Sequence, residues 1–225
     1  SSLTAETSVK IWDPELDCVE FPVSVYTGSP RQRIWKPGCR RVAGQPDVFT
    51  DWINSRRYVH SYVWNKIYRR TLFQDVRFPV GKNFEDVCTL PRLLHRARAV
   101  LLSEAGLYYY RYREDSITVR STARTLRDRM EAFRALYYEA RSFETCRREC
   151  VVMYLGMVDT LIEWMRASDT APGEAQRASD VLRHDAPSLF TLLQLDVPMK
   201  VKVKNLPLAC FGLNLHCRLY ARLRR

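Results

Sequence analysis

The spacing of apolar residues along the first 120 positions predicts several short strands. Apolar and polar residues alternate over 17–28, which predicts a half-buried strand. The apolar residues of this alternation are Val19, Phe21, Val23 and Val25. Apolar runs at 99–103 and 106–112 predict two further short strands. Pro-Gly and Gly-Gln-Pro breaks at 31–49 predict a loop or an irregular hairpin.

Helical periodicity occurs twice in this region and dominates the chain after it. Residues 61–73 and 84–99 are amphipathic at helical spacing, although Pro91 makes the first turns of the second helix irregular. After Thr125, two longer apolar stripes predict two long helices, which end at the Pro- and Gly-containing segment 167–180. The first stripe is Leu126, Met130, Phe133, Tyr137 and Ala140, and the second is Val151, Leu155, Val158, Ile162 and Met165.

The end of the chain combines positive charge with apolar residues at helical spacing. Residues 197–225 carry seven Lys and Arg residues and no acidic residue, and without these seven the net charge of +11 would be +4. The apolar residues form one predicted helix stripe, Leu208, Phe211, Leu215, Leu219 and Leu223. A basic helix with such a stripe fits an anionic membrane surface, and it equally fits a terminal helix that packs on its own domain.

Length and composition indicate a folded protein in a reducing compartment. The 225 residues, of which 46% are hydrophobic, suffice for one large domain with a real core. Seven scattered cysteines without a Cys-x-x-Cys pair argue against a disulfide framework or a closed zinc site. Cys210, His216 and Cys217 fit packing better than metal binding. Residues 1–10 lack the apolar core of a signal peptide, and no apolar run approaches the ~20 residues that span a bilayer, so we expect a cytoplasmic protein.

An adjacent pair of carboxylates, Glu85-Asp86, follows a Gly-containing loop at the start of the second predicted helix. The positive end of a helix dipole favours acidic side chains there, typically by less than ~1 kcal/mol each at an exposed site. From these two residues alone, a solvated helix start is the more common explanation and a catalytic carboxylate the less common one. The sequence around the pair changes that balance.

An ordered set of motifs surrounds the acidic pair: Trp-x-Lys-x-Tyr, Arg-Phe, a glycine, Glu-Asp, Tyr-x-Tyr-Arg and Ser-Ile. The residues are Trp64, Lys66, Tyr68, Arg77, Phe78, Gly81, Glu85, Asp86, Tyr108, Tyr110, Arg111, Ser116 and Ile117. Each motif alone is weak, but their order over about 55 residues resembles the second half of the family-2 inverting glycosyltransferases of the glycosyltransferase-A fold. Bacterial members that build capsular polysaccharide, exopolysaccharide or lipopolysaccharide are the most similar.

The resemblance implies different roles for the two acidic residues. Inverting transfer needs one base to take the proton of the acceptor hydroxyl while the anomeric carbon is attacked. The family gives this role to the Asp of the Glu-Asp pair, which is Asp86 in this chain. Glu85 would orient substrate or the surrounding structure.

The resemblance also implies a set of substrate-binding residues. Arg111 and Arg113 alternate with aromatic residues on a predicted strand, and an Arg fork there suits a diphosphate or an anionic acceptor. Without the motif, both would be interpreted as solvated. Trp64 and Tyr68 are candidates for stacking on a sugar or acceptor, although aromatic residues on a helix are more often core. Lys66 is expected on the acceptor side. Arg113 stands where some relatives have a His that reaches the metal or diphosphate.

The sequence lacks the motifs of the family's first half. The nucleotide-binding acidic-Gly-Ser signature and the Asp-x-Asp pair that grips the metal and the diphosphate are absent, and Asp13, Glu15 and Asp17 do not reproduce that pair. The resemblance therefore implies a divalent cation, Mg²⁺ or Mn²⁺, in an intact enzyme and none bound by this chain alone. We expect the chain to be an expression fragment, a truncated gene product or one half of a split enzyme.

Together these patterns predict an α/β chain in three parts. Residues 1–122 would form the acceptor-side half of a glycosyltransferase-A fold, 123–198 a helical extension and 199–225 a basic amphipathic tail. The implied function is inverting transfer of a sugar from a nucleotide sugar to a polysaccharide or lipid-linked acceptor. It would take place at the inner face of the membrane, which the protein would contact through Lys200 to Arg225.

Two other classes of function remain open. One is a non-catalytic adaptor at the membrane surface that keeps a degenerate glycosyltransferase fold without the donor site. The other is a basic domain that binds nucleic acid. The second is less favoured, because the charge is concentrated in the amphipathic tail and no zinc finger, KH or RRM motif accompanies it.

Overall fold

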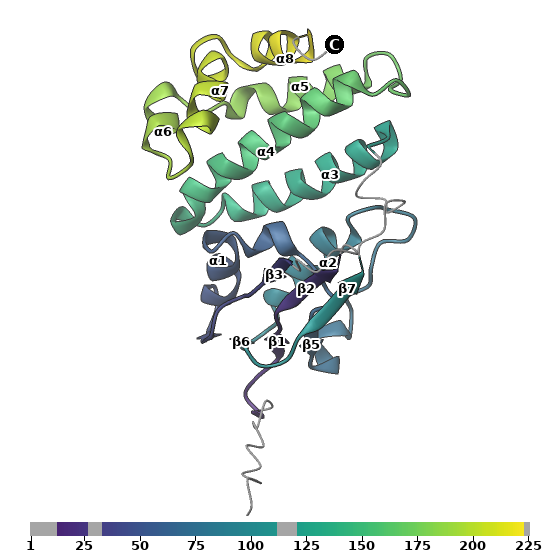
Figure 1. Cartoon of the computed structure of the whole chain (residues 1–225), viewed down its shortest axis with the longest axis vertical. Helices are drawn as coiled ribbons and strands as arrows, with labels where there is room; N and C mark the ends of the chain where they lie inside the picture. Colours follow the sequence, from purple (N-terminus) through teal and green to yellow (C-terminus); the bar gives the residue numbers. More distant parts are fainter. Residues whose placement is uncertain (1–12, 27–32, 112–120, 223–225) are drawn as a thin grey trace, which may run out of the picture.

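Two small β-sheets lie at one end of the molecule and layers of helices lie at the other (Figure 1). The computed structural model describes residues 13–26, 33–111 and 121–222. The fold is mixed α/β, as predicted. Within the described residues, every strand lies before Thr122 and long helices follow it.

The larger sheet has four strands in the order β4-β6-β1-β5. Strand β1 (Cys18–Glu20) lies inside it, parallel to β6 (Ala99–Leu102) and antiparallel to β5 (Lys66–Tyr68). Strand β4 (Arg40–Ala43) pairs antiparallel with the other side of β6. All three residues of β1 are buried, so both faces of the sheet are covered at this strand.

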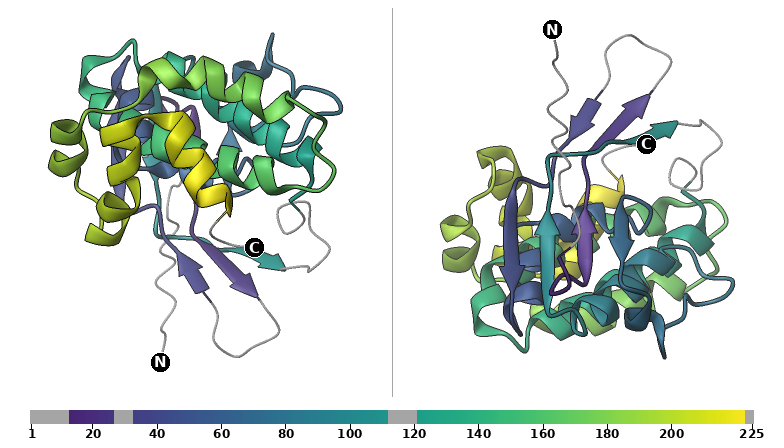
Figure 2. Two further views of the ribbon diagram at one scale, coloured as in Figure 1. Left: turned by 90° about the horizontal axis from the view of Figure 1, so that it is seen from above. Right: turned by 90° about the horizontal axis from the view of Figure 1, so that it is seen from below.

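The smaller sheet has the order β3-β2-β7 and extends to one side of the main body (Figure 2). Its middle strand β2 (Val23–Tyr26) pairs antiparallel with β3 (Arg33–Trp35) and parallel with β7 (Tyr108–Arg111). The single strand predicted over 17–28 is therefore two strands that join different sheets. They separate at Pro22, which has no N–H to donate to a continuous ladder.

The predictions for the other strands have mixed outcomes. The strands predicted at 99–103 and 106–112 are confirmed as β6 and β7. The segment 31–49 is partly a hairpin, because β3 returns along β2, but β4 joins the larger sheet instead. The sequence prediction missed α1 (Asp47–Asn54), a short helix that follows a proline and buries five of its eight residues.

The helix predicted over 61–73 is wrong. The structure has a 3₁₀ helix η1 (Arg57–His60), then strand β5, and then a second 3₁₀ helix η2 (Arg70–Phe73). Strand β5 pairs residue by residue with β1, which places Lys66 opposite Glu20. Pairing with a buried strand outweighs the helical periodicity of the segment, because tertiary contacts override local propensity.

The remaining predicted helices are present. The helix predicted over 84–99 is α2 (Glu85–Leu94), which ends earlier because the chain turns into β6. The two long helices are α3 (Ala123–Ala140) and α4 (Arg147–Arg166), joined through the 3₁₀ helix η3 (Glu144–Cys146). They pack against each other, and α3 also contacts α2, so α3 lies between the sheet region and α4 (Figure 1).

Shorter helices lie beyond α4, on the side away from the sheets (Figure 1). They are α5 (Glu174–Leu182), the 3₁₀ helix η4 (Arg183–Asp185), α6 (Leu189–Gln194), α7 (Met199–Phe211) and α8 (Leu213–Arg222). Helix α5 begins inside the segment predicted to be a break, after Gly173 at its N-cap. Among the described residues, no helix is both long enough and apolar enough to cross a membrane.

The terminal stripe predicted from Leu208 to Leu223 is not one helix face. Gly212 has a φ of +83° and separates α7 from α8, so the two helices do not share one helical register. Within the predicted stripe Leu208 is buried, Leu223 lies outside the described residues, and the exposed members are Phe211, Leu215 and Leu219. Helix α8 packs on α4 and α7 and buries a different set, Leu213, His216 and Cys217.

Candidate functional site

The loop before α2 has an unusual backbone conformation. Gly81 and Phe84 both have left-handed φ angles, +72° and +58°, and only the glycine adopts that region without strain. Asp128 of α3 holds the residues between them. Its carboxylate accepts hydrogen bonds from the backbone N–H of Asn83 (3.1 Å), from Asn83 Nδ2 (2.9 Å) and from Lys82 Nζ (3.4 Å). The strained residue stands directly before the acidic pair, which makes this loop a candidate functional element.

The pKa of Asp128 indicates that its role is to hold the loop. Burial acts to raise this pKa, but the hydrogen bonds from Asn83 and the charge of Lys82 outweigh burial, so the pKa lies below its ordinary value. Asp128 therefore stays ionised at neutral pH and keeps its bonds to the loop. A residue of α3 thus fixes the start of α2.

The two acidic residues at the start of α2 have different surroundings. Glu85 is exposed, whereas Asp86 is half-buried and its Oδ1 accepts a hydrogen bond from the N–H of Val87 (2.8 Å). The pKa of Asp86 is raised, chiefly because burial disfavours the charged carboxylate, with a smaller contribution from the charge of Glu85. The Val87 N–H and the charge of Lys66 act in the opposite direction. A carboxylate with a raised pKa is the stronger base, so Asp86 is the better candidate for proton transfer.

Asp86 lies at a pocket of about 470 Å³ between the start of α2, the η1 region and helices α3 and α4. This volume falls within the ~300–1,000 Å³ that is typical of small-molecule sites. Apolar side chains from three helices form much of the wall, among them Phe84, Val87, Leu126, Phe133, Val152 and Met157. Among the described residues that line it, those that can carry charge near neutral pH are Asp86 and Arg129. The arrangement combines one candidate base with an apolar interior.

Aromatic rings stack in a row from this pocket onto the smaller sheet. Tyr62, which lines the pocket, stacks on Trp64 with ring centroids 4.5 Å apart and an angle of 18° between the ring planes. Trp64 contacts two residues of β7, Tyr110 (5.1 Å, 13°) and Tyr108 (4.5 Å, 35°). These four rings are half-buried or exposed, so part of each remains accessible. Trp64 is thus a loop residue within an aromatic platform and not a helix residue.

The platform extends beyond Tyr62 and is electrostatically close to Asp86. His60 and then Trp35 of β3 continue the row of rings. Burial lowers the pKa of His60, which favours a neutral ring. The pKa of Tyr62 is raised, first by burial and then by the charges of Tyr110 and Asp86. The hydroxyl of Tyr62 therefore lies within electrostatic reach of the candidate base.

Lys66 and Tyr68 lie on β5 and face the protein interior. The side chain of Lys66 is only 1% exposed, and its Nζ pairs with Glu20 Oε1 (3.1 Å). The same Nζ donates hydrogen bonds to Asn65 Oδ1 (2.8 Å) and to the carbonyl of Tyr62. The ring of Tyr68 meets Phe73 edge-on at 5.4 Å, and its buried hydroxyl has no hydrogen-bond partner among the described residues. Lys66 therefore supports the loop that carries the platform.

The predicted Arg fork lies at the edge of the described chain. Arg111 is exposed at the end of β7, beside Tyr110 of the platform. Arg113, Ser116 and Ile117 lie outside the described residues. The structure thus places Arg111 at the end of a strand that also carries two platform rings.

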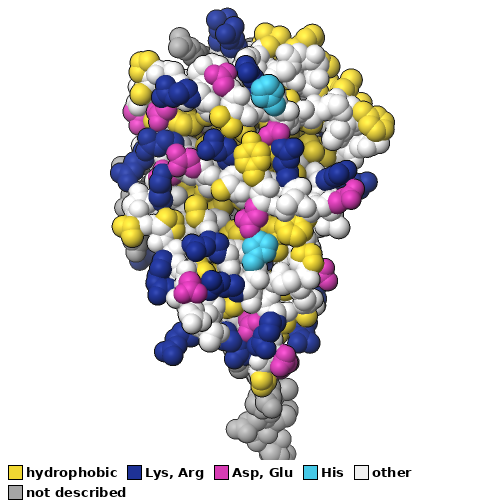
Figure 3. Space-filling view, turned by 180° about the vertical axis from the view of Figure 1, so that it is seen from behind, with side chains coloured by type: hydrophobic (Ala, Val, Ile, Leu, Met, Phe, Trp, Pro, Cys, Tyr) yellow, Lys and Arg dark blue, Asp and Glu magenta, His cyan; other side chains and the backbone are white. Residues whose placement is uncertain are grey.

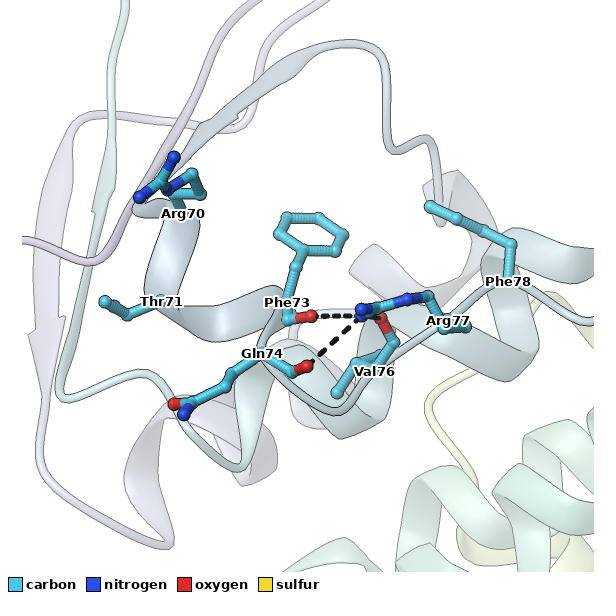
Figure 4. Close-up of a pocket in the computed structure, with 7 residues that line it drawn as sticks. All are labelled: Arg70, Thr71, Phe73, Gln74, Val76, Arg77 and Phe78. Atoms are coloured by element: carbon cyan, nitrogen blue, oxygen red, sulfur yellow. Dashed lines mark hydrogen bonds between the residues drawn. The ribbon is translucent and has the colours of Figure 1, made fainter.

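A second open pocket of about 610 Å³ lies along η2 and the loop after it (Figure 4). Arg77, from the Arg-Phe motif, points back into this loop, and its Nη1 donates to the carbonyls of Val76 (2.9 Å), Gln74 (3.3 Å) and Phe73. The guanidinium therefore closes the turn between η2 and the segment that leads to Gly81. None of the described residues that line this pocket carries a carboxylate, so they offer no general base of the kind found at Asp86.

The described residues do not contain a ligand set for the implied cation. No three His, Cys, Asp or Glu side chains among them come together as a metal-binding group. Cys210 is exposed, whereas His216 and Cys217 are buried in α8. Burial lowers the pKa of His216 to about 4 and raises that of Cys217 to about 12. No chemical step can be derived through a metal from these side chains.

Sequence reasoning missed Tyr62 and Asp128. Tyr62 precedes Trp64 by two residues, and this Tyr-x-Trp spacing is a signal that could have indicated a shared aromatic surface. Asp128 bonds to a loop 45 residues earlier in the chain, and nothing in its own segment distinguishes it from a solvated helix residue. No protein-family model and no curated protein sequence matches this chain.

Proposed function

We propose that this chain is the acceptor-side part of a family-2 inverting glycosyltransferase with a glycosyltransferase-A fold. The observation that carries the proposal is the position of Asp86. Its half-buried carboxylate has a raised pKa and lines the same pocket as Tyr62, whose ring belongs to the aromatic platform. A flat aromatic face complements the apolar C–H face of a sugar ring, and the adjacent base serves a sugar hydroxyl.

In the proposed reaction, the acceptor hydroxyl attacks the anomeric carbon of a nucleotide sugar. The new carbon–oxygen bond forms while the hydroxyl proton passes to Asp86. At the same time the bond from the anomeric carbon to the nucleoside diphosphate breaks, and the diphosphate leaves with the electron pair. Attack from the face opposite the leaving group inverts the anomeric centre.

The other predicted residues take supporting roles in this proposal. Trp64 and the rings around it hold the acceptor sugar, and the exposed Glu85 orients it. Arg111 and Arg113 bind an anionic group of the acceptor or the diphosphate. Lys66 acts at a distance, because its ammonium fixes the carbonyl of Tyr62. A divalent cation would neutralise the leaving diphosphate in an intact enzyme, with ligands from outside the described side chains.

Ligand-observed NMR with a panel of neutral and acidic oligosaccharides tests the acceptor platform. We expect Trp64→Ala to weaken the binding of the oligosaccharides that bind the unmodified chain by about two- to tenfold, because a stacked aromatic contact contributes ~0.5–1.5 kcal/mol. Tyr109→Ala is the matched control. Tyr109 is exposed between two platform residues, and successive strand residues point to opposite faces. Equal binding by both variants would contradict the platform.

A membrane contact through residues 200–225 is a second proposal, with its own observation. Phe211, Leu215 and Leu219 are exposed on α7 and α8, and Arg218 and Arg222 lie on the same helix as the two leucines. Apolar side chains beside cations suit an anionic membrane surface. Co-sedimentation with vesicles of anionic lipid tests it. Binding should fall as salt rises, and Leu215→Asp should weaken it; sedimentation that salt and Leu215→Asp leave unchanged would contradict it.

A non-catalytic adaptor would use the same membrane contact without the proton transfer. Loss of sugar transfer on replacement of Asp86 would distinguish the enzyme from the adaptor.

Nucleic acid is the least favoured partner. On the face shown in Figure 3, Lys and Arg side chains are scattered among acidic and apolar ones and do not form a continuous stripe. A nucleic-acid surface generally gathers its cations along the phosphate backbone. We therefore propose a peripheral protein of the inner membrane face that acts on carbohydrate.

A further inference from the structure

We infer that the pocket beside Asp86 binds a hydrocarbon chain, alkyl or isoprenyl, that is attached to the acceptor sugar. The inference rests on the proposed function, because it takes the sugar platform as the place of the acceptor. It narrows the acceptor to a class that carries an apolar group. Three features of the pocket support it: its apolar lining, the hydrogen bonds that its hydroxyl groups already make within the protein, and Tyr62, which belongs both to the pocket and to the platform.

Three of the four Ser and Thr hydroxyl groups among the described lining residues already have partners within the protein. Thr160 Oγ1 donates to the carbonyl of Gly156 (3.0 Å), and Ser61 Oγ donates to the carbonyl of Tyr58 (2.6 Å). Thr125 Oγ1 lies 2.8 Å from Thr122 Oγ1. These side chains therefore present mainly their carbon atoms to the cavity. Apart from Asp86 and Arg129, a lining of this kind gains little from water or a polar ligand and favours an apolar one.

Gly156 is an exposed glycine in the wall of this pocket. It lies in the middle of α4, where a glycine is less favourable than an alanine, and it lines the pocket. A Cβ atom placed on Gly156 would meet no heavy atom within 4 Å outside the neighbouring helix backbone. Close packing of another helix does not explain the glycine, since no such neighbour approaches it. The position is exposed, so a larger side chain there would extend into the open space of the pocket.

Tyr58, which lines the pocket, belongs to a set of hydrogen bonds that connects η1 with α4 and with the segment before α7. Tyr58 Oη donates to Glu149 Oε2 of α4 (3.3 Å), and Glu149 also accepts from Arg56 Nε (3.0 Å). Arg56 Nη2 then reaches the carbonyl of Asp196 (3.1 Å). These bonds hold η1 against α4 and the segment before α7. The pocket is therefore preformed between fixed elements, which lowers the entropy cost of binding.

The polar groups at the pocket explain how a tail would be coupled to a sugar. Asp86 and Tyr62 line the cavity, and the ring of Tyr62 is also part of the platform. A sugar on the platform would have its hydroxyl near Asp86 and its aglycone directed to the cavity between α3 and α4. The apolar side chains from Leu126, Phe133, Val152 and Met157 would then cover the hydrocarbon.

The test uses ligand-observed NMR titrations of the full chain with three probes: 1-octanol, methyl β-D-glucoside and n-octyl β-D-glucoside below its micelle concentration. Octanol has a tail without a sugar, so its binding tests the pocket alone. Gly156→Leu and Val152→Phe each place a larger side chain at the pocket wall, and Gly156→Ala is the matched control. Circular dichroism identifies any variant that fails to fold, and either filling variant suffices.

We expect octanol to bind the unmodified chain, to bind Gly156→Ala within about twofold, and to bind a folded filling variant at least tenfold more weakly. We also expect octyl glucoside to bind at least tenfold more tightly than methyl glucoside. The inference is overturned if octanol does not bind, or if the filling variants bind it as well as the unmodified chain does. Equal affinities for octyl glucoside and octanol would remove the link to the acceptor sugar. Trp64→Ala with oligosaccharides tests the proposed function separately, because Trp64 does not line the pocket.

Discussion

Replacement of Lys66 by Met separates a structural role of this lysine from a role in substrate binding. The Nζ of Lys66 lies 3.1 Å from Glu20 Oε1, and both side chains are 1% exposed. Glu20 also pairs with Arg57, whose Nη1 lies 2.9 Å from Oε2. Lys66→Met keeps most of the length and packing of the side chain but removes its charge and all its hydrogen bonds.

The magnitude follows from what the change leaves unpaired. Removal of one partner of a buried ion pair typically costs about 3–5 kcal/mol, because the other charge stays buried. Arg57 still compensates part of the charge of Glu20, which lowers the cost, whereas the carbonyl of Tyr62 and Oδ1 of Asn65 lose a charged donor, which raises it. We expect a loss of about 3 kcal/mol in the free energy of unfolding. With a urea m-value of about 3 kcal/mol/M, the midpoint falls by about 1 M.

Urea denaturation followed by tryptophan fluorescence measures this loss, with Lys36→Met at an exposed position as the control. The control should stay within about 0.5 kcal/mol of the unmodified chain. The double variant Glu20→Gln/Lys66→Met should recover part of the loss, because it removes the orphaned charge. If Lys66→Met unfolds at the unmodified midpoint and oligosaccharide binding nevertheless weakens, the lysine is a substrate residue and the structural reasoning is refuted.

Three further predictions concern other parts of the chain. Asp128→Ala should lower the free energy of unfolding by about 1–3 kcal/mol at pH 7. Because the pKa of Asp128 is lowered in the folded state, this stabilisation is present above the pKa of the unfolded carboxyl and is lost as pH falls through the folded pKa. The urea midpoints of the variant and the unmodified chain should therefore converge in acid. Midpoints that stay apart would contradict this prediction. Leu213→Ala should lower the free energy of unfolding by about 2–5 kcal/mol in a thermal or urea melt, because Leu213 is buried. Leu215→Ala, at an exposed position, should lower it by less than about 0.5 kcal/mol. Equal losses would refute the packing of α8 on α4. Calorimetric titration with UDP and Mn²⁺ should show no micromolar binding, and such binding would place a donor site in this chain.

Local periodicity predicted the elements whose partners are local or whose pattern is long. Helices α3 and α4 and strands β6 and β7 follow from their apolar spacing alone. The same reasoning failed for β5, because its conformation is set by pairing with β1 about 48 residues earlier, and the register Glu20↔Lys66 is invisible in a helical pattern. It also failed at Gly212, where one residue with a positive φ divides the predicted tail stripe into two helices.

The candidate site shows the same division. Asp86 could be named from the motifs around it, which lie close in the sequence. The bonds of Asp128 to Asn83 and the contact of Trp64 with Tyr110 each join residues about 45 positions apart, so only the folded chain shows them. The pocket between α3 and α4 depends on the packing of the two helices, which no motif encodes. Contacts between residues far apart in the sequence were therefore missed.

The central claim is that Asp86 is the general base of a sugar transfer. It is tested most directly by the rate of nucleoside diphosphate release at saturating donor and acceptor, in the intact protein that contains this chain. Asp86→Asn should lower kcat by about 10²–10⁴-fold and leave donor affinity nearly unchanged, whereas Glu85→Gln should keep most activity. The unmodified rate should fall with acid as pH drops through the raised pKa of Asp86. An Asp86→Asn protein with near-normal turnover and the unmodified pH profile would contradict the claim.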